Sequence, residues 1–213
     1  ILWVSRRAPV GHPDFGQVFP CSCPAAQATR RAELLRGANL PHPESPRTFL
    51  NFTPRPGATV AFEAALEYAH GDGAYKILTL VGRKGSGKSH LLEAIGRSFV
   101  EAGVSVNYAY TVDLLDRLKA CFDTESTERF YEVWEGYSSV SVLLLDDLGV
   151  EGATGWAVER LSALIDARYR NERRLVIATN LLTNPAFVAK LGERTASRLW
   201  DVSTGLCRLV PLT

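Results

Sequence analysis

The fold of this chain is decided by residues 78–96, LTLVGRKGSGKSHLLEAIG. An apolar run ends at Gly82, and a segment rich in glycine and lysine follows up to Lys88. Leu91 and Ile95 then recur at helical spacing. A short continuous apolar run is typical of a strand that is covered on both faces. The stretch therefore predicts a buried strand, a flexible charged loop and an amphipathic helix.

The loop between these elements matches the phosphate-binding pattern G-x-x-x-x-G-K-[ST] at Gly82, Gly87, Lys88 and Ser89. Glycines let backbone N–H groups point at phosphate oxygens, and the following helix adds its positive N-terminal end. We expect Lys88 to reach the β- and γ-phosphates of a nucleotide and the Ser89 hydroxyl to ligate Mg²⁺. The alternative is a glycine-rich turn that only joins a strand to a helix. The other positions of the predicted binding segment are Arg83, Lys84, Gly85, Ser86 and His90.

The composition sets limits on the class of protein. A chain of 213 residues is long enough for one sizeable core, and its net charge of +1 indicates neither a nucleic-acid binder nor a membrane-surface protein. No apolar run reaches the length of a membrane span, and we expect no contact with a membrane. The four cysteines are too few for a disulfide scaffold, so we expect a cytoplasmic protein. Because the chain begins at Ile1, we expect it to be a fragment or to lack its natural start.

The chain divides at about residue 48. Residues 1–48 are rich in Pro, Arg and Ala and predict an N-terminal extension and linker, with one weak helix over 29–40 ending near Gly37. Residues 49–213 alternate between apolar runs and helical patterns, which predicts a parallel sheet with helices on both faces. The expected strands are 76–81, 104–110, 140–147, 174–180 and 206–212. The expected helices are 58–70, 88–101, 157–170 and 184–200, the last with Asn184 as N-cap, plus a partly irregular helical stretch over 112–137.

Polar residues follow two of the predicted strands. In VLLLDDLG, residues 142–149, the predicted strand ends in Asp146 and Asp147, at the edge of the sheet where ligands bind. Asp146 would hold Mg²⁺ through water, and Asp147 would polarise the attacking water. Asn180 ends the strand VIATN and would place an amide beside the γ-phosphate. The plainer interpretation is that two acids face solvent at a strand end and that an asparagine only terminates its strand.

Two arginines are spaced to share one helix face. Arg194 and Arg198 lie four residues apart in GERTASRLW. One interpretation is that an arginine reaches the nucleotide of a neighbouring subunit and stabilises the transition state. The other is a surface pair near a helix C-terminus, where cations are favoured.

Taken together, GRKGSGKSHLL, LLLDDLG, ATN and GERTASRL resemble the DnaC/IstB group of AAA+ ATPases, which comprises helicase loaders and the helper ATPases of IstB-type transposition. The resemblance covers about Thr48 to Thr213. It implies an α/β P-loop NTPase fold of the AAA+ type, a three-layer sandwich around a central parallel sheet that lacks a full C-terminal lid. It also implies slow, assembly-dependent hydrolysis of ATP to ADP and phosphate.

The resemblance implies roles for single residues. Asp146 would serve the metal, Asp147 would stand where the catalytic acid belongs, and Asn180 would be the sensor of the γ-phosphate. Arg198 would be the arginine finger, with Arg194 as the second candidate. Residues in the segment TFLNF would line the adenine pocket, namely Asn51 and Phe52.

The stretch from Leu114 to Tyr137 resembles the helical insertion that faces single-stranded DNA in relatives. Cations in this stretch would contact phosphates, and aromatic side chains would stack on bases. The plainer interpretation is that the charges are solvated and the aromatics buried. The residues concerned are Arg117, Lys119 and Arg129, and Phe122, Phe130 and Tyr131.

The two cysteines near the N-terminus could supply two of the four ligands of a tetrahedral zinc site. Cys21 and Cys23 make a C-x-C pair, which some family members complete with an earlier pair into a zinc ribbon. His12 and His42 are the other potential ligands, but their spacing does not fit such a site. We therefore expect free thiols without a metal.

The leading functional hypothesis is an ATP-driven loader in DNA replication that forms a homo-oligomer with ATP, binds single-stranded DNA and delivers a replicative helicase. An IstB-type helper that recruits a transposase is the first alternative, and the ATPase core does not separate the two. A P-loop kinase of small molecules and a nucleotide-binding scaffold without hydrolysis are further alternatives.

Overall fold

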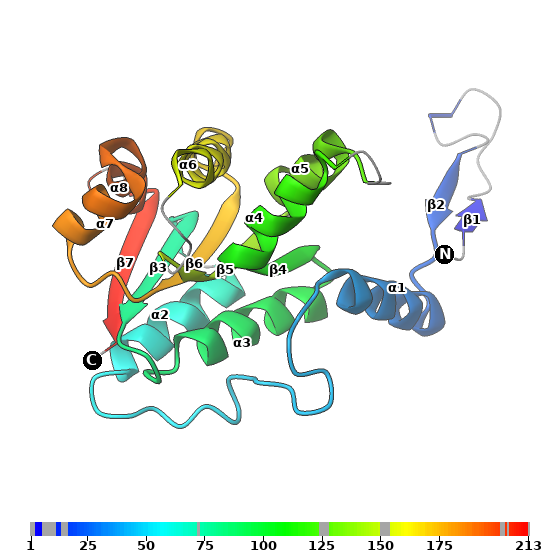
Figure 1. The fold of residues 1–213 in the computed structure, drawn as a ribbon. Coiled ribbons are helices and arrows are strands. Elements are labelled where there is room, and N and C mark those ends of the chain that lie inside the picture. The colour runs from blue at the N-terminus through cyan, green and yellow to red at the C-terminus, as the bar shows by residue number, and fades with distance from the viewer. Residues whose placement is uncertain are drawn as a thin grey trace.

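A five-stranded parallel sheet carries the fold in the computed structural model, which describes residues 3–5, 12–13, 17–71, 73–123, 128–149, 154–200, 203 and 205–212. The spatial order of its strands is β4-β5-β6-β3-β7 (Figure 1). The strand that leads into the glycine-rich loop therefore lies between β6 and β7. The bounds are β3 Ile77–Gly82, β4 Val106–Tyr110, β5 Val142–Leu148, β6 Arg174–Thr179 and β7 Cys207–Leu212.

Helices cover both faces of this sheet, so the predicted three-layer sandwich is confirmed (Figure 1). Every residue of β3 is buried, because its continuous apolar run supplies side chains to two cores. No helix in the described part of the chain is both long and apolar enough to cross a membrane. One face carries α2 Thr59–His70 and α3 Lys88–Glu101, and the other carries α4 Thr111–Ala120, α5 Phe130–Ser138, α6 Gly155–Arg170, α7 Asn184–Leu191 and α8 Glu193–Trp200.

The C-terminal helical region differs from the sequence prediction in two ways. The single helix expected over 184–200 is split, because Gly192 takes φ +81° at the end of α7 and α8 starts after it. The predicted N-cap, Asn184, is wrong. Thr183 is the cap, and its hydroxyl oxygen accepts a hydrogen bond from the Ala186 N–H at 3.4 Å.

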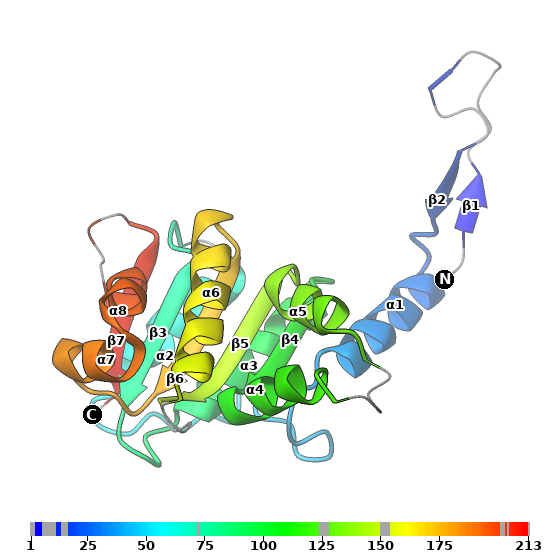
Figure 2. The same ribbon diagram turned by 45° about the horizontal axis from the view of Figure 1, so that its top comes forward.

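The N-terminal extension holds more structure than its composition predicts. Helix α1, Pro24–Gly37, starts before the predicted residue 29, and a short antiparallel pair, β1 Trp3–Ser5 and β2 Val18–Pro20, precedes it. Figure 2 shows this pair beyond the N-terminal end of α1, away from the central sheet. The other end of α1 covers the edge of β4, where the Tyr108 N–H donates to the Ala38 carbonyl at 2.8 Å.

The linker after α1 is fixed to α3 by one carboxylate. Glu93 is fully buried and accepts hydrogen bonds from Arg97 Nη2 at 2.6 Å and from the Arg47 N–H at 3.3 Å. His42 Nδ1 lies 2.9 Å from the other carboxylate oxygen. A buried carboxylate is stable only when it is paired and hydrogen-bonded in this way. The linker therefore reaches Thr48 on a fixed path and places residues 48–52 beside the glycine-rich loop.

Candidate nucleotide-binding site

The carboxyl ends of the parallel strands gather the predicted site residues at one edge of the sheet. β3 ends in Gly82, β5 contains Asp146 and Asp147, and Asn180 follows β6. β6 lies between β3 and β5, so the amide comes between the loop and the acids. Ligands of open α/β sheets bind outside this edge.

The glycines of the loop are required by its geometry. A Cβ atom on Gly82 would lie 2.5 Å from the Leu212 carbonyl oxygen, and one on Gly87, at φ +102°, would lie 2.9 Å from the Phe52 ring. The Ser86 hydroxyl is buried in this loop with no hydrogen-bond partner. A buried polar atom without a partner costs free energy unless a ligand or water satisfies it. The loop is thus a tight turn with an unsatisfied hydroxyl, which fits a bound phosphate group.

Lys88 connects the loop to the neighbouring strand. Its side chain is nearly buried, and its ammonium donates to the carbonyls of Gly82 at 2.8 Å and Arg83 at 3.0 Å and to Asn180 Oδ1 at 2.9 Å. Burial lowers the pKa of Lys88, although the charges of Asp146 and Asp147 oppose that shift. A desolvated cation held by uncharged acceptors will bind an anion strongly.

The two acids near the carboxyl end of β5 have different environments. Asp146 is fully buried, and its Oδ2 accepts from the Tyr108 hydroxyl at 2.5 Å while its Oδ1 accepts from the Asp147 N–H at 2.9 Å. Asp147 is half-buried in a left-handed conformation, at φ 55°. Burial and the neighbouring charge of Asp146 raise the pKa of Asp147, while Lys88 and Lys84 oppose the shift. Asp146 is thus fixed, whereas the side chain of Asp147 is free to meet a ligand.

The donor set at this edge suits Mg²⁺ with a triphosphate. Two carboxylates and the half-buried Ser89 hydroxyl are oxygen ligands of the kind that Mg²⁺ prefers, and Lys88 supplies the positive charge. Arg83 and Lys84, in the middle of the loop, are exposed, and the charge of Lys84 acts on Asp147.

The segment before α2 lies against the same loop. Phe52 covers Gly87, stacks on Phe62 at 5.6 Å between ring centroids and meets the His90 ring edge-on at 5.1 Å. Asn51, the other predicted adenine contact, is exposed, and its amide bonds within its own turn to Thr48 N–H at 2.8 Å and to the Pro46 carbonyl at 2.9 Å. Phe52 therefore borders the site, while Asn51 shapes the turn that presents it.

Arg194 and Arg198 share one face of α8, as their spacing predicts, but they do not contact the phosphate loop of their own chain. Both reach Asp166 on α6, Arg194 at 2.8 Å and Arg198 at 3.4 Å, and Arg198 also lies 4.3 Å over the Tyr169 ring. Figure 1 places α8 on the face of the sheet opposite α3. The Arg194 side chain is 70% exposed and that of Arg198 is 31% exposed.

Helices α4 and α5 carry an aromatic cluster with a partly exposed surface. Phe122 lies 5.4 Å from Phe130, and Phe130 stacks on Trp134 at 6.1 Å. Phe122 is 65% exposed and Tyr131 is 82% exposed. Of the predicted cations, Arg117 is bound to Glu128 at 2.5 and 2.9 Å, whereas Lys119 and Arg129 are exposed. Residues 124–127 lie outside the described part of the chain.

The N-terminal cysteines do not meet further metal ligands in the part of the chain that is described. Cys21 and Cys23 are free thiols, and the Cys23 N–H donates to Cys21 Sγ at 3.3 Å. His42, one of the two histidines considered as ligands, is bound to Glu93 instead. Among the described residues, no three His, Cys, Asp or Glu side chains group as a metal site would require.

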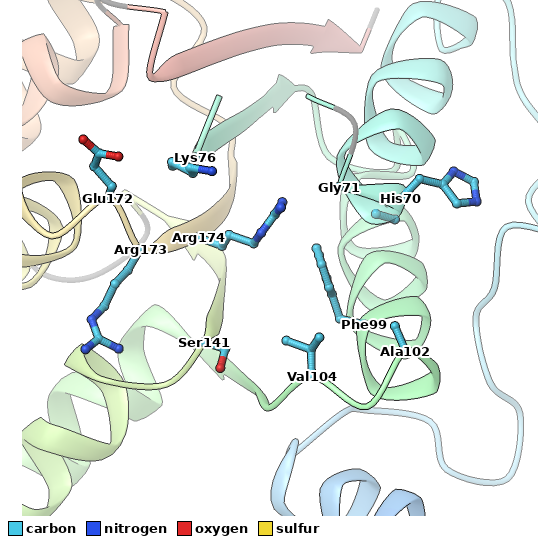
Figure 3. A pocket seen from close by; sticks show the side chains of 11 residues that line it. His70, Gly71, Lys76, Phe99, Ala102, Val104, Ser141, Glu172, Arg173 and Arg174 are labelled. Carbon is cyan, nitrogen blue, oxygen red and sulfur yellow. The ribbon is translucent and has the colours of Figure 1, made fainter. Parts of the chain in front are cut away.

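The opposite edge of the sheet has a depression of about 440 Å³ with several cations on its walls (Figure 3). The guanidinium of Arg174 lies 5.2 Å over the Phe99 ring and donates to the Tyr68 carbonyl at 3.4 Å. Arg174 thus meets the C-terminal end of α2, where a positive charge is favoured, whereas Arg173 donates to the Ser139 carbonyl. Both arginines of the depression therefore have partners within the chain.

Sequence reasoning missed Tyr108 on β4 and Thr111 at the start of α4, which both contact Asp146 on the neighbouring strand β5. The Thr111 hydroxyl donates to the Asp146 carbonyl at 2.9 Å, next to the contact of Tyr108 with the carboxylate. Nothing in the local pattern marks these residues, because the contact depends on β4 pairing with β5.

Comparison with known proteins places this geometry in a family. A family model described as IstB-like ATP binding protein matches residues 25–201. The chain is 27% identical over 118 residues to the replicative helicase loader DnaC of Buchnera aphidicola subsp. Acyrthosiphon pisum, covering 55% of this chain and 48% of that protein. It is 30% identical over 176 residues to the chromosomal replication initiator protein DnaA of Thermotoga petrophila, covering 79% and 37%. The chain thus spans less than half the length of these relatives.

Solved structures show the same fold. The crystal structure of the DnaC helicase loader superposes with a TM-score of 0.66 at 25% identity, covering 78% of this chain and 97% of that chain. The crystal structure of DnaI gives a TM-score of 0.60 at 20% identity, covering 85% and 90%. Because the family model spans most of the 213 residues, the chain belongs to the IstB-like ATP-binding proteins, AAA+ ATPases related to DnaC and DnaA.

Proposed function

We propose that this protein hydrolyses ATP, with Mg²⁺, at the carboxyl edge of its sheet. The observation that carries the proposal is the convergence of Lys88, Asn180 and the two acids at the carboxyl ends of three adjacent strands. The backbone N–H groups of the glycine loop and the Lys88 ammonium would hold the β- and γ-phosphates. Ser89 and Asp146 would hold Mg²⁺, which supplies positive charge against the phosphate oxygens.

Asp147 is the residue proposed to act on the attacking water. Its half-exposed carboxylate would accept a hydrogen bond from that water and orient its oxygen toward the γ-phosphorus. Asn180 already bonds Lys88, so its amide is near enough to the ammonium to sense the γ-phosphate. Since aspartate reaches less far than glutamate, hydrolysis is proposed to be slow.

The proposed role of this ATPase is to load a replicative helicase in DNA replication. Its similarity to DnaC, both in sequence and in fold, supports this role. Loading would require a homo-oligomer in which each nucleotide lies between the phosphate loop of one subunit and Arg198, or else Arg194, of the next. Both arginines are held by Asp166 in the single chain and would exchange that partner for the phosphate.

Single-stranded DNA is the proposed ligand of helices α4 and α5. The exposed rings of Phe122 and Tyr131 offer faces on which bases stack, and Lys119 and Arg129 add exposed positive charge. Arg117 contributes less, because Glu128 neutralises it.

The second candidate function is that of a transposition helper, and the match to the IstB-like family model favours it. Both roles use the same ATPase core, so the partner decides between them. The experiment is affinity capture from the native cell with a non-hydrolysable ATP analogue, using Lys88→Ala as the control that should capture neither partner. Recovery of a helicase supports loading, recovery of a transposase supports the helper role, and equal recovery with Lys88→Ala contradicts both.

A further inference from the structure

Tyr108 contacts the carboxylate that is proposed to serve Mg²⁺. Its ring is 4% exposed, and its hydroxyl donates to Asp146 Oδ2 at 2.5 Å. The other oxygen, Oδ1, accepts from the Asp147 N–H. Both oxygens of a fully buried carboxylate therefore have one fixed donor each.

The position of Tyr108 is itself fixed from both sides of its strand. β4 pairs in parallel with β5, with Tyr108 opposite Leu144, and the Tyr108 N–H bonds the Ala38 carbonyl at the end of α1. Thr111, the first residue of α4 directly after this strand, bonds the backbone of Asp146. The hydroxyl thus approaches the carboxylate from a rigid frame.

The hydroxyl is the donor in this contact. Its O–H points to Asp146 Oδ2, which is within hydrogen-bond distance. Asp146 Oδ2 accepts that hydrogen bond, and a carboxylate oxygen that accepts one hydrogen bond retains lone pairs for further contacts.

We propose that Tyr108 is a positioning residue for magnesium, which holds the Asp146 carboxylate in the orientation that the metal's water shell requires. The inference rests on the proposed function of the same site. Hydrogen-bond partners of metal-binding carboxylates typically change metal affinity by about 10- to 100-fold when they are removed. Without the hydroxyl, the carboxylate would turn about its own side-chain bonds and lose that orientation.

The test is Tyr108→Phe, which removes the hydroxyl and keeps the buried ring. The affinity for a fluorescent ATP analogue is measured once with EDTA and once with saturating Mg²⁺, and the ratio of the two dissociation constants reports the contribution of the metal. Damage to the fold weakens binding in both conditions and leaves the ratio unchanged.

The matched control is Tyr68→Phe. Tyr68 is also fully buried, and its hydroxyl donates to the Lys76 carbonyl at 2.7 Å, at the opposite edge of the sheet. Both variants should lower the thermal unfolding midpoint by similar amounts. We expect the Mg²⁺ ratio to fall by about tenfold in Tyr108→Phe and to stay at the wild-type value in Tyr68→Phe.

Two outcomes count against different claims. An unchanged ratio in Tyr108→Phe, with wild-type protein that binds ATP more tightly with Mg²⁺, overturns the positioning role. Wild-type protein that does not bind the analogue in either condition overturns the proposed ATPase function instead. A titration of Mg²⁺ at fixed ATP gives a second reading, in which the half-saturating concentration should rise for Tyr108→Phe alone.

Discussion

Two cations, Lys88 and Arg168, are buried in this molecule, but their hydrogen-bond acceptors differ. Arg168 is fully buried, and its guanidinium donates to five backbone carbonyls that join the end of α5, the start of β5 and the start of β6. Lys88 donates to two carbonyls of a glycine-rich loop and to one side chain. Among the described residues, neither cation forms an ion pair with a carboxylate.

The difference lies in what holds each charge. The acceptors of Arg168 belong to three rigid segments at the amino edge of the sheet, so the cation serves as a fixed crosslink. The acceptors of Lys88 lie at the carboxyl edge in a tight loop and on Asn180, where a phosphate can take their place. Burial lowers the pKa of Arg168 to about 10, yet a guanidinium remains charged at neutral pH. A buried cation is therefore evidence of a ligand site only when a ligand could replace the groups that hold it.

The largest expected effect is on stability, from Arg168→Met. The substitution leaves five carbonyls without a donor, so we expect the free energy of unfolding to fall by at least about 3 kcal/mol. Chemical denaturation measures it. Arg170→Met is the control, since Arg170 lies on the same helix with its side chain 66% exposed. Equal effects of the two substitutions would contradict the crosslink.

The second prediction concerns Lys88→Ala. We expect ATP affinity to fall by at least about tenfold, because the desolvated ammonium that meets the phosphates is lost. Stability should change by about 1 kcal/mol or less, because burial lowers the pKa of Lys88 and so disfavours its charged form. Calorimetry and denaturation measure the two quantities. Lys84→Ala, an exposed lysine of the same loop, should retain affinity; similar losses in both variants would refute the special role of Lys88.

The third prediction uses pH to test the neighbour of Lys88. Because burial raises the pKa of Asp147, the carboxylate becomes protonated at a higher pH than an ordinary aspartate. ATPase activity that needs the carboxylate is therefore full above that pKa and is lost as pH falls through it. Asp147→Asn should abolish hydrolysis and keep ATP binding. Hydrolysis rates measured against pH check this, and an unaltered acidic limb in Asp147→Asn would argue against Asp147 as the acting group.

The free energy of unfolding depends on the protonation of Asp147 with the opposite sign to that of a carboxylate in an ion pair. The pKa of Asp147 is raised in the folded protein because burial disfavours its charged form. Above the folded-state pKa, the charged carboxylate therefore lowers the free energy of unfolding. This loss of stability disappears as the pH falls through the folded-state pKa and the carboxylate becomes protonated. Asp147→Asn should therefore be neutral or slightly stabilising at pH 7 in denaturation experiments.

The smallest expected effect on the isolated chain comes from Arg198→Ala. Arg170 and Arg194 still pair with Asp166 in this variant, so folding and ATP binding by the monomer should change little. Hydrolysis that depends on assembly should disappear, which comparison of rates at low and high protein concentration will reveal. Arg194→Ala serves as the matched variant. A greater loss with Arg194→Ala would assign the finger to the more exposed arginine.

Much of this site was predictable because its signals are local. The loop Gly82–Ser89 and the two acids of β5 are each contiguous in sequence, and each directly follows a continuous apolar run. The helix break at Gly192 was missed because apolar residues recur at helical spacing on both sides of it. The sequence predicts Asn184 as the cap because Pro185 is assigned to the first helical position, whereas α7 begins one residue earlier and Thr183 is the cap. The start of α1 was missed because Cys23 makes no side-chain cap and the helix has a weak apolar face.

The sequence by itself determined that a strand, a phosphate-binding loop and a helix follow one another, since residue type and spacing fix local backbone and burial. Only the tertiary structure decided which side chains meet: Lys88 with Asn180, Tyr108 with Asp146, and Arg168 with its carbonyls. These contacts depend on the strand order β4-β5-β6-β3-β7. Strand order arises from packing of the whole sheet between two helical layers, which no local pattern encodes.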